Sequence, residues 1–557
     1  MENKVKVYCL NNNLTKEYPL GTSLWEIAQD MKIKLDYPIL GARVNNKLSE
    51  LNYKIYRPKF VEFIDITNID GYRMYQRSLS FVLMKAVRDL LPGSRLKIEH
   101  SISQGFYCEI EKPDNSKLKP EEVLEIAERM RQIIDADLPF YREEIPTQQA
   151  IKIFEEYQLF EKAKLFRTRP TLFTSVYKLD NQIDYFYGYL VPSTGYLKIF
   201  DLIPYYDGML LRFPTIDNPD ELGPIIEQPK LFEIFREYKN WVEILGVSTI
   251  GSINEKIKQG KAGELIKVSE ALHEKKVAQI ADMIHKRGNV RLVLIAGPSS
   301  SGKTTFSKRL AIQLRVLGYD PVAISLDNFF VNREDTPRDE NGNYDFENVR
   351  ALDIDLFTKV MNDLIAGKEV EMPKFDFHQG QRYYDGTKAK LSDRGIIVIE
   401  GIHGLNPILS KGIDDKFKFK IYVSALTQLG IDYHNRIPTT DNRLLRRMIR
   451  DYQYRGYSLV ETLQRWPSVR KGEEKYIFPF QEEADVMFNS AMIYEFSVLK
   501  KHLEPLLKEI PETAYEYSEA RRLLKFLSYF EPIVREEREI PPTSILREFL
   551  SGSAFKY

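Results

Sequence analysis

The sequence predicts a multidomain protein with a front half of α+β units and a second half built around an α/β domain with a parallel sheet. The chain has 557 residues, which is more than one ordinary domain contains. From Arg291 onward, short and fully apolar runs alternate with helix-like runs, the pattern of a parallel sheet covered by helices. One of these runs, Arg291–Ala296, leads directly into a glycine-rich turn.

Composition and charge are those of a folded protein. Hydrophobic residues make up 43% and charged residues 29% of the chain, which excludes extended disorder. Lys plus Arg and Asp plus Glu number 80 each, so the net charge is zero and any anion site must be local. With only Cys9 and Cys108, no disulfide framework is expected and a reducing cytoplasm is favoured. We find no apolar signal-peptide core and no run of about 18 apolar residues, so no membrane association is expected.

Residues 1–66 are predicted to form a small α+β module. Apolar and polar residues alternate at its start, a helix-like stretch covers Ser23–Met31, and strand-like runs follow at Ala42–Val44 and Val61–Ile66.

Residues 70–225 are predicted to form a second α+β domain, and 228–288 a helical connector. The domain opens with helix-like Arg77–Leu91 and Pro120–Ala136, the latter with the favourable helix start Pro-Glu-Glu. Strand-like runs rich in Tyr and Phe follow up to Pro214.

The second half is predicted to consist of the α/β domain, 289–495, and a helical C-terminal extension, 496–557. Within the α/β domain, Val322–Leu326, Ile396–Ile399 and Phe417–Val423 are further buried strands.

The glycine-rich turn has the spacing of a nucleotide-binding phosphate loop. It stands between an apolar strand and helix-like Phe306–Leu317, the order that this motif requires. Glycines let successive N–H groups face a phosphate, the lysine reaches the β- and γ-phosphates of ATP, and the threonine hydroxyl can bind Mg²⁺. By chance the pattern would occur in about one or two chains of this length per hundred. The residues expected to bind ATP are Gly297, Pro298, Ser299, Ser300, Ser301, Gly302, Lys303, Thr304 and Thr305.

Two acids stand at the ends of predicted strands, Asp327 after Val322–Leu326 and Glu400 after Ile396–Ile399. Ligands of an open parallel sheet gather at the carboxyl ends of its strands, so both should lie near the γ-phosphate. A carboxylate there can accept a hydroxyl proton or hold Mg²⁺. Taken singly, each acid could instead be a helix cap or an ordinary loop residue. With Lys303, they are the expected catalytic groups, and Thr304 and Glu400 are the expected metal ligands.

Four arginines, at positions 443, 446, 447 and 450, are spaced to share one helix face. A solvated basic stripe is the alternative, but the neighbouring turns hold few acids, and only Asp451 is placed to pair with Arg447. An unpaired arginine face suits the charge of a triphosphate and of a phosphoryl-transfer transition state. We therefore expect catalytic roles for Arg443 and Arg447 and substrate binding by Arg446.

Segment 291–495 resembles the uridine kinase and phosphoribulokinase family of P-loop kinases, with nucleoside kinases the nearest branch. The resemblance rests on GPSSSGKTTFSKRL (297–310), SLDNFF (325–330), YDFENVRALD (344–353), MPKFDF (372–377), IIVIEGIHGL (396–405) and DNRLLRRMIRD (441–451). It implies that Asp327 is the general base for a ribose 5′-hydroxyl, that Glu400 serves Mg²⁺, and that Asp345 and Glu347 bind ribose hydroxyls.

The chain departs from this family at the base pocket. Where uridine kinases show Tyr-Asp-Phe and then a base-reading histidine, the chain has Phe375, Asp376 and Phe377, and Gly380 stands at the histidine position. His378 lies two residues early, as a relocated contact or as a simple loop residue. Phe375 can stack on a base but cannot donate a hydroxyl hydrogen bond. Phe375, Asp376 and His378 complete the expected substrate site.

The front half resembles threonyl-tRNA synthetase. YPLGTSLWEIAQDM (18–31) and GARVNNKLSEL (41–51) resemble its TGS domain, and SISQGFYCEI (101–110), EEVLEIAERMRQII (121–134) and VPSTGYLKIFDL (191–202) its editing domain. The four editing positions of that domain fall here on Arg77, Phe81, Phe186 and Leu190, none of which offers an imidazole or thiolate to zinc. Editing chemistry is therefore not expected. We interpret the front half as a retained fold that serves binding, regulation or homo-oligomerisation.

The resulting functional hypothesis is an ATP- and Mg²⁺-dependent nucleoside kinase, with uridine or cytidine as the nearest acceptors. One alternative keeps the kinase chemistry but changes the acceptor to another hydroxyl metabolite, such as a sugar phosphate or pantothenate. Another is a nucleotide- or tRNA-sensing protein whose loop only switches conformation. Zero net charge argues against tRNA as a partner. The presence of Asp327, Glu400 and the arginine face together argues against a loop that only switches conformation.

Overall fold

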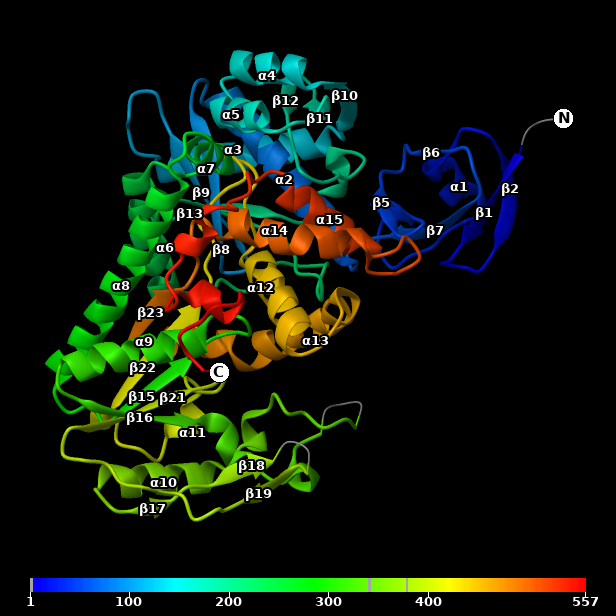
Figure 1. The fold of residues 1–557 in the computed structure, drawn as a ribbon. Helices are drawn as coiled ribbons and strands as arrows, with labels where there is room; N and C mark the ends of the chain where they lie inside the picture. Colours follow the sequence, from blue (N-terminus) through cyan, green and yellow to red (C-terminus); the bar gives the residue numbers. More distant parts are fainter. Residues whose placement is uncertain (1–3, 339–341, 377–378, 557) are drawn as a thin grey trace.

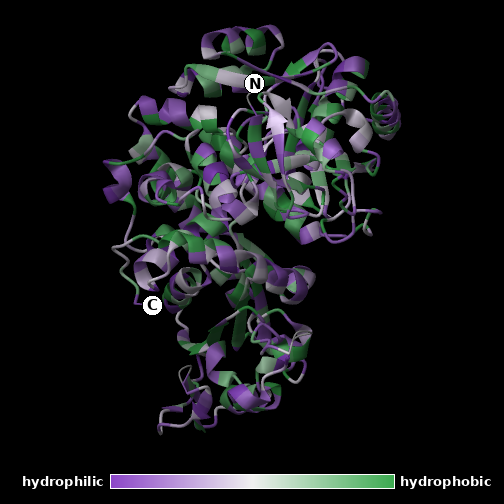
Figure 2. Ribbon diagram, turned by 90° about the vertical axis from the view of Figure 1, so that its right-hand side faces the viewer, coloured by the Kyte–Doolittle hydropathy of each residue, from purple (hydrophilic) through white to green (hydrophobic). Residues whose placement is uncertain are grey.

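The computed structural model describes residues 4–338, 342–376 and 379–556. The predicted combination of α+β sheets in the front half and a parallel α/β sheet in the second half is confirmed. Hydrophobic residues (green) run through the interior of both halves, and hydrophilic residues dominate the outer loops (Figure 2). Within the described residues, no helix has the length and apolar character needed to cross a membrane.

The N-terminal module is a five-stranded mixed sheet, in the order β2-β1-β7-β4-β5, set to one side of the molecule (Figure 1). Only β1 and β7 run parallel. Helix α1 begins after Ser23, whose side chain and that of Glu26 form a reciprocal capping box. The element bounds are β1 (Lys4–Cys9), β2 (Thr15–Pro19), β3 (Thr22–Ser23), α1 (Leu24–Asp30), β4 (Gly41–Val44), β5 (Lys47–Ser49), β6 (Lys54–Ile55) and β7 (Lys59–Ile64).

The second front domain has a four-stranded antiparallel sheet, in the order β13-β14-β9-β8, and a smaller sheet of β10, β11 and β12. Its long first helix starts at Ile69, earlier than expected, because the Asn68 side chain accepts a hydrogen bond from the Asp70 N–H and caps it. The bounds are α2 (Ile69–Leu90), β8 (Arg95–Ile102), β9 (Gly105–Glu111), α3 (Pro120–Asp135), β10 (Tyr141–Pro146), α4 (Thr147–Glu156), α5 (Phe160–Thr168), β11 (Phe173–Leu179), β12 (Gln182–Asp184), β13 (Asp201–Tyr205) and β14 (Gly208–Arg212).

Three helices lead from the front half to the second half. They are α6 (Pro229–Leu245), α7 (Ile250–Lys258) and α8 (Ala262–Arg287). The 26-residue α8 runs along the flank of the molecule to the first strand of the next sheet (Figure 1). Its buried Val277, Ile280 and Ile284 pack against that sheet, so the connector belongs to the same core.

The sheet of the second half has five strands, all parallel, in the order β16-β21-β15-β22-β23. Helices α8 and α9 pack against one face and α10 against the other, which explains why every residue of β15 is buried. The bounds are β15 (Leu292–Ala296), α9 (Lys303–Val316), β16 (Asp320–Ser325), α10 (Ile354–Ile365), β17 (Val370–Glu371), β18 (Lys374–Asp376), β19 (Gln381–Tyr383), β20 (Lys388–Ala389), β21 (Gly395–Glu400), α11 (Pro407–Ser410), β22 (Lys418–Ser424) and β23 (Val486–Asn489).

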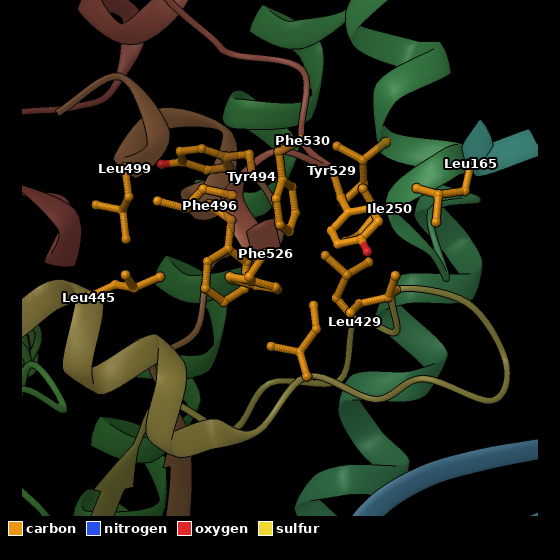
Figure 3. Packing of buried hydrophobic residues seen from close by; sticks show 14 of the residues in the cluster. Leu165, Ile250, Leu429, Leu445, Tyr494, Phe496, Leu499, Phe526, Tyr529 and Phe530 are labelled. Atoms are coloured by element: carbon orange, nitrogen blue, oxygen red, sulfur yellow. The ribbon is translucent and has the colours of Figure 1, made fainter. Parts of the chain in front are cut away.

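The remaining helices join the two halves. They are α12 (Thr439–Tyr454), α13 (Leu459–Tyr476), α14 (Glu495–Lys508) and α15 (Tyr517–Leu527). In Figure 3, Phe496, Phe526 and Phe530 of this region pack together in a cluster that also holds Leu445 of α12 and Leu165 of α5. One hydrophobic cluster therefore contains residues of both halves, in addition to the separate cores of the individual sheets.

Candidate active site

The turn after β15 is curled in the way a phosphate loop requires. A Cβ on Gly297 would lie 1.9 Å from the carbonyl oxygen of Val423, so no larger residue fits there. Gly302 has φ +84°, a left-handed conformation that favours glycine, and Ser300 has φ +59°. The loop ends directly in helix α9, whose first turn offers its N–H groups to an anion.

Lys303 is the first residue of α9 and lies at the carboxyl edge of the sheet. Its Nζ donates a hydrogen bond to the carbonyl oxygen of Pro298 at 3.2 Å. Burial lowers the pKa of Lys303, while the carboxylates of Glu400, Glu548 and Glu473 act in the opposite direction. The loop lysine is therefore held among acids of three distant segments.

The two acids expected at the strand ends do lie beside the loop. Glu400, the last residue of β21, accepts a hydrogen bond from the Thr304 hydroxyl at 3.0 Å. Asp327 lies in the 3₁₀ turn Leu326–Phe329 that follows β16. Burial and the Glu400 carboxylate raise the pKa of Asp327, and Lys303 opposes this shift. The structure thus brings these four side chains together, and their catalytic roles remain predictions.

The prediction of an unpaired arginine face on α12 is wrong. Arg443 forms a bidentate ion pair with Glu473, with one N–O distance of 2.8 Å. Arg447 and Arg450 both pair with Asp451, at 3.1 and 2.8 Å. Glu473 comes from α13, so inspecting the neighbouring turns of α12 could not have found it.

Arg446 also departs from its predicted role in substrate binding. Its Nε lies 2.8 Å from a Glu495 carboxylate oxygen, and neither side chain is exposed. A second nitrogen donates to the carbonyl oxygen of Ser490 at 2.8 Å. Arg446 therefore fastens α12 to the start of α14 in the protein interior instead of facing a substrate.

Arg443 and Arg447 nevertheless reach the phosphate loop. Arg443 donates to the carbonyl oxygen of Ser299 at 3.1 Å, and Arg447 donates to the Ser299 hydroxyl at 2.8 Å. Glu473, which sequence reasoning missed, accepts a hydrogen bond from the Ser299 N–H at 3.0 Å. Helix α13 thus supplies a carboxylate that holds both an arginine and the first part of the loop.

A second missed acid, Glu548, lies at the start of α9. Its carboxylate accepts hydrogen bonds from the Thr305 N–H at 3.1 Å and from the Thr305 hydroxyl at 2.6 Å. Ile545, three residues before Glu548, packs against the loop: a Cβ on Gly302 would lie 2.6 Å from the Cγ2 of Ile545. No local motif marks Glu548, because it lies 243 residues from Thr305. A carboxylate of the C-terminal segment therefore occupies an N–H group that a nucleotide phosphate would use.

The residues expected to bind the acceptor divide between two places. Asp345 accepts a hydrogen bond from the Tyr476 hydroxyl, and a Cβ on Gly472 would meet the Glu347 carboxylate at 2.8 Å, so both acids lie against α13. The ring centroid of Phe375, on β18, lies 5.6 Å from that of Phe330 near Asp327.

Asp376, beside Phe375, accepts a hydrogen bond from the Gln379 N–H at 3.1 Å, so this carboxylate is at least partly engaged in its own turn. The predicted contact His378 lies outside the described residues.

His403 is a further polar residue that the prediction did not include. It is 2% exposed, and neither ring nitrogen has a partner among the described atoms. Its ring centroid lies 6.4 Å from that of Tyr476, and burial lowers its pKa to about 4. His403 therefore places a neutral imidazole close to Asp345.

In the front half, the positions that would carry editing chemistry are filled by a packed core. The ring centroids of Phe81 and Phe186 lie 5.2 Å apart, and Leu190 belongs to the same buried cluster. Arg77 donates through Nε to the carbonyl oxygen of Tyr189 at 3.1 Å. No group of three or more His, Cys, Asp or Glu residues suited to a metal occurs in residues 4–338, 342–376 and 379–556.

Comparisons with known proteins divide the chain at the same place as its architecture. The model of the "Phosphoribulokinase / Uridine kinase family" matches residues 292–495. Uridine-cytidine kinase A of Dictyostelium discoideum is 29% identical over 229 residues, which cover 40% of this chain and 42% of that protein. The solved "Structure of a Possible Uridine Kinase from Bacillus stearothermophilus" is 20% identical, with a TM-score of 0.26, and covers 39% of this chain and 98% of that one.

The other similarity is to threonine–tRNA ligases. That of Syntrophomonas wolfei is 32% identical over 190 residues, which cover 34% of this chain, and that of Carboxydothermus hydrogenoformans is 32% identical over 193 residues. The chain spans about 30% of the length of these ligases. The second half of this protein contains a P-loop kinase domain of the phosphoribulokinase and uridine kinase family, preceded by a region that resembles threonine–tRNA ligase.

Proposed function

We propose that this protein transfers the γ-phosphoryl group of ATP to the 5′-hydroxyl of a nucleoside, with uridine and cytidine as the preferred acceptors. The observation that carries the proposal is the meeting of Lys303, the Thr304–Glu400 pair and Asp327 at one edge of the parallel sheet. The similarity to a uridine-cytidine kinase supports the choice of acceptor.

The site has the chemistry to hold magnesium and ATP. The hydroxyl oxygens of Ser300 and Ser301 are buried without a partner among the described atoms, in the loop that would surround the phosphates. Thr304 and Glu400 offer the oxygen ligands that Mg²⁺ prefers. Bound Mg²⁺ would neutralise charge on the phosphate oxygens, and Lys303 would act on the β- and γ-phosphates.

In the proposed reaction, Asp327 accepts the proton of the attacking hydroxyl. The hydroxyl oxygen forms a bond to the γ-phosphorus while the bond from phosphorus to the β,γ-bridging oxygen breaks, which releases ADP. A buried carboxylate with a raised pKa is a stronger base than an exposed one, as proton abstraction requires. Arg443 and Arg447 position the loop through Ser299.

An acceptor screen with labelled ATP tests the proposal. We expect transfer to uridine or cytidine with kcat/KM at least about 10-fold above that for purine nucleosides or pantothenate, because hydrogen-bonded pockets discriminate strongly. If phosphoryl transfer to a compound other than a nucleoside were preferred, the proposed acceptor would be wrong and the proposed kinase chemistry would stand. ATP binding without transfer to any acceptor would favour a nucleotide-sensing protein instead.

Removal of the Glu548 carboxylate should strengthen nucleotide binding. Because Glu548 occupies the Thr305 N–H, a phosphate must displace it, and the fraction of molecules ready to bind is reduced accordingly. We expect Glu548→Ala to lower the Kd for ATP about 10-fold in isothermal titration calorimetry. Glu539→Ala is the matched control, because Glu539 lies in the same segment but pairs with Lys267 at 2.8 Å. An unchanged Kd for Glu548→Ala would make Glu548 a purely structural helix cap.

A further inference from the structure

Four cations gather between the front half and the C-terminal helices, away from the phosphate loop. They are Arg77 on α2, Arg142 on β10, Arg169 at the end of α5 and Lys525 on α15. Burial, and then Arg169, Arg142 and Arg77 in that order, lower the pKa of Lys525 to about 7. All three arginines thus lie within electrostatic reach of one lysine.

None of the four cations forms an ion pair with any residue in the part of the chain that the structure describes. Arg77 donates to the carbonyl oxygen of Tyr189, and Arg169 donates to the Ser528 hydroxyl at 3.3 Å. The Nε of Arg169 is buried and has no hydrogen-bond partner among the described atoms. The Glu50 carboxylate interacts electrostatically with Arg142, but from beyond ion-pair distance. It accepts a hydrogen bond from the Tyr177 hydroxyl.

Tyrosine rings form the surroundings of this cation cluster. The Arg77 guanidinium lies 5.5 Å from the ring centre of Tyr187, and Arg142 lies 5.5 Å from that of Tyr189. Arg169 lies 4.3 Å from the ring centre of Tyr529. Such contacts lessen the repulsion between cations but do not neutralise their charge. Arg77, Arg169 and Lys525 are partly buried and Arg142 is exposed. The carboxylates of Asp70 and Glu50 act on Arg77 and Arg142 only from beyond ion-pair distance. A cluster of like charges without such a close carboxylate is costly unless an anion occupies it.

We propose that the Arg77–Arg142–Arg169–Lys525 cluster binds an anion with several negative charges, namely the phosphate groups of a di- or triphosphate. Guanidinium groups suit phosphate because each can donate two parallel hydrogen bonds. A single phosphate would leave much of the charge uncompensated. The anion would contact α2, β10 and the end of α5 from the front half and α15 from the C-terminal helices, so its binding would tie these segments together.

Anion binding to this cluster is separable from binding at the phosphate loop. The test measures the affinity of pyrophosphate and of ADP by isothermal titration calorimetry, with the full chain carrying Lys303→Met to weaken the loop. Adding Lys525→Met or Arg169→Met should weaken pyrophosphate binding about 10-fold, the loss of one charge-assisted contact. Arg521→Met is the matched control, because Arg521 is an exposed cation on the same helix.

Three outcomes decide the proposal. Equal affinities of ADP and pyrophosphate assign recognition to the phosphates alone, whereas tighter binding of ADP assigns a nucleotide. Binding that Lys303→Met abolishes and Lys525→Met leaves intact would overturn the cluster as a site while leaving the proposed kinase function untouched.

Stability without ligand gives an independent check. Neutral Lys525→Met should raise the melting temperature of the ligand-free protein, because it removes repulsion, and should diminish the further rise on adding pyrophosphate. A lower melting temperature for this variant, with an undiminished response to pyrophosphate, would show that the cluster is compensated internally.

Discussion

Asp327→Asn is expected to lower kcat by about 10² to 10⁴-fold, the usual contribution of a positioned general base. An amide keeps the size of the side chain but cannot accept the proton of the acceptor hydroxyl. Binding of ATP should change little, because the phosphates are expected to contact the loop and Lys303 rather than Asp327. The measurements are kcat with a saturating nucleoside acceptor and the Kd of ATP by calorimetry.

Asp320→Asn provides the matched control for this experiment. Asp320 begins β16, whereas Asp327 follows its carboxyl end, so the control changes the same residue type at the opposite edge of the sheet. Its kcat should stay within about 2-fold of the unmodified protein, as for a surface substitution. Turnover of Asp327→Asn within that same range would remove Asp327 from the role of base.

The phosphate loop could be predicted because all its determinants are contiguous in sequence. Strand β15, the glycines and helix α9 follow one another directly, and the backbone curl depends on Gly297 and Gly302. Asp327 and Glu400 were also predictable, because the carboxyl ends of parallel strands meet at one edge whatever the intervening chain does. The local sequence pattern was sufficient to predict the loop, and sheet topology was sufficient to place the two acids beside it.

The partners of the arginines could not be predicted in this way. Glu473 and Glu495 lie 30 and 49 residues from the arginines that they pair with, on helices whose packing no local pattern determines. Glu548 reaches the loop from the C-terminal segment for the same reason. Charge spacing on one helix shows which residues share a face, but whether that face is solvated depends on what packs against it.

The ion pairs that connect the two halves could likewise not be predicted from the sequence. Arg73 of α2 donates to Glu519 of α15 at 2.6 Å, and Arg522 of α15 lies 2.7 Å from Asp441 of α12. This chain of ion pairs runs from the front half to the helix that carries Arg443 and Arg447. Ion pairs therefore connect the front half to the helix that holds the phosphate loop, although two of its four editing positions, Phe81 and Phe186, are filled by aromatic rings.

Arg446→Met is expected to lower the free energy of unfolding by about 3 to 5 kcal/mol, because it leaves a buried carboxylate without its ion-pair partner. Glu495 is fully buried, and among the described residues only the Asn442 side chain and the Met492 N–H would still donate to it. The measurement is urea-induced unfolding followed by fluorescence. A residue that contacted only substrate would instead change KM and leave this stability intact.

Two further variants separate the buried pair from a general loss of charge on α12. Arg450→Met removes a half-buried arginine of the same helix whose partner Asp451 keeps Arg447 and Arg455, so its cost should stay below about 1 kcal/mol. Adding Glu495→Gln to Arg446→Met should recover part of the lost stability, because a neutral amide is cheaper to bury than an unpaired carboxylate. If Arg446→Met were as stable as Arg450→Met, the Arg446–Glu495 pair would not be what fastens α12 to α14.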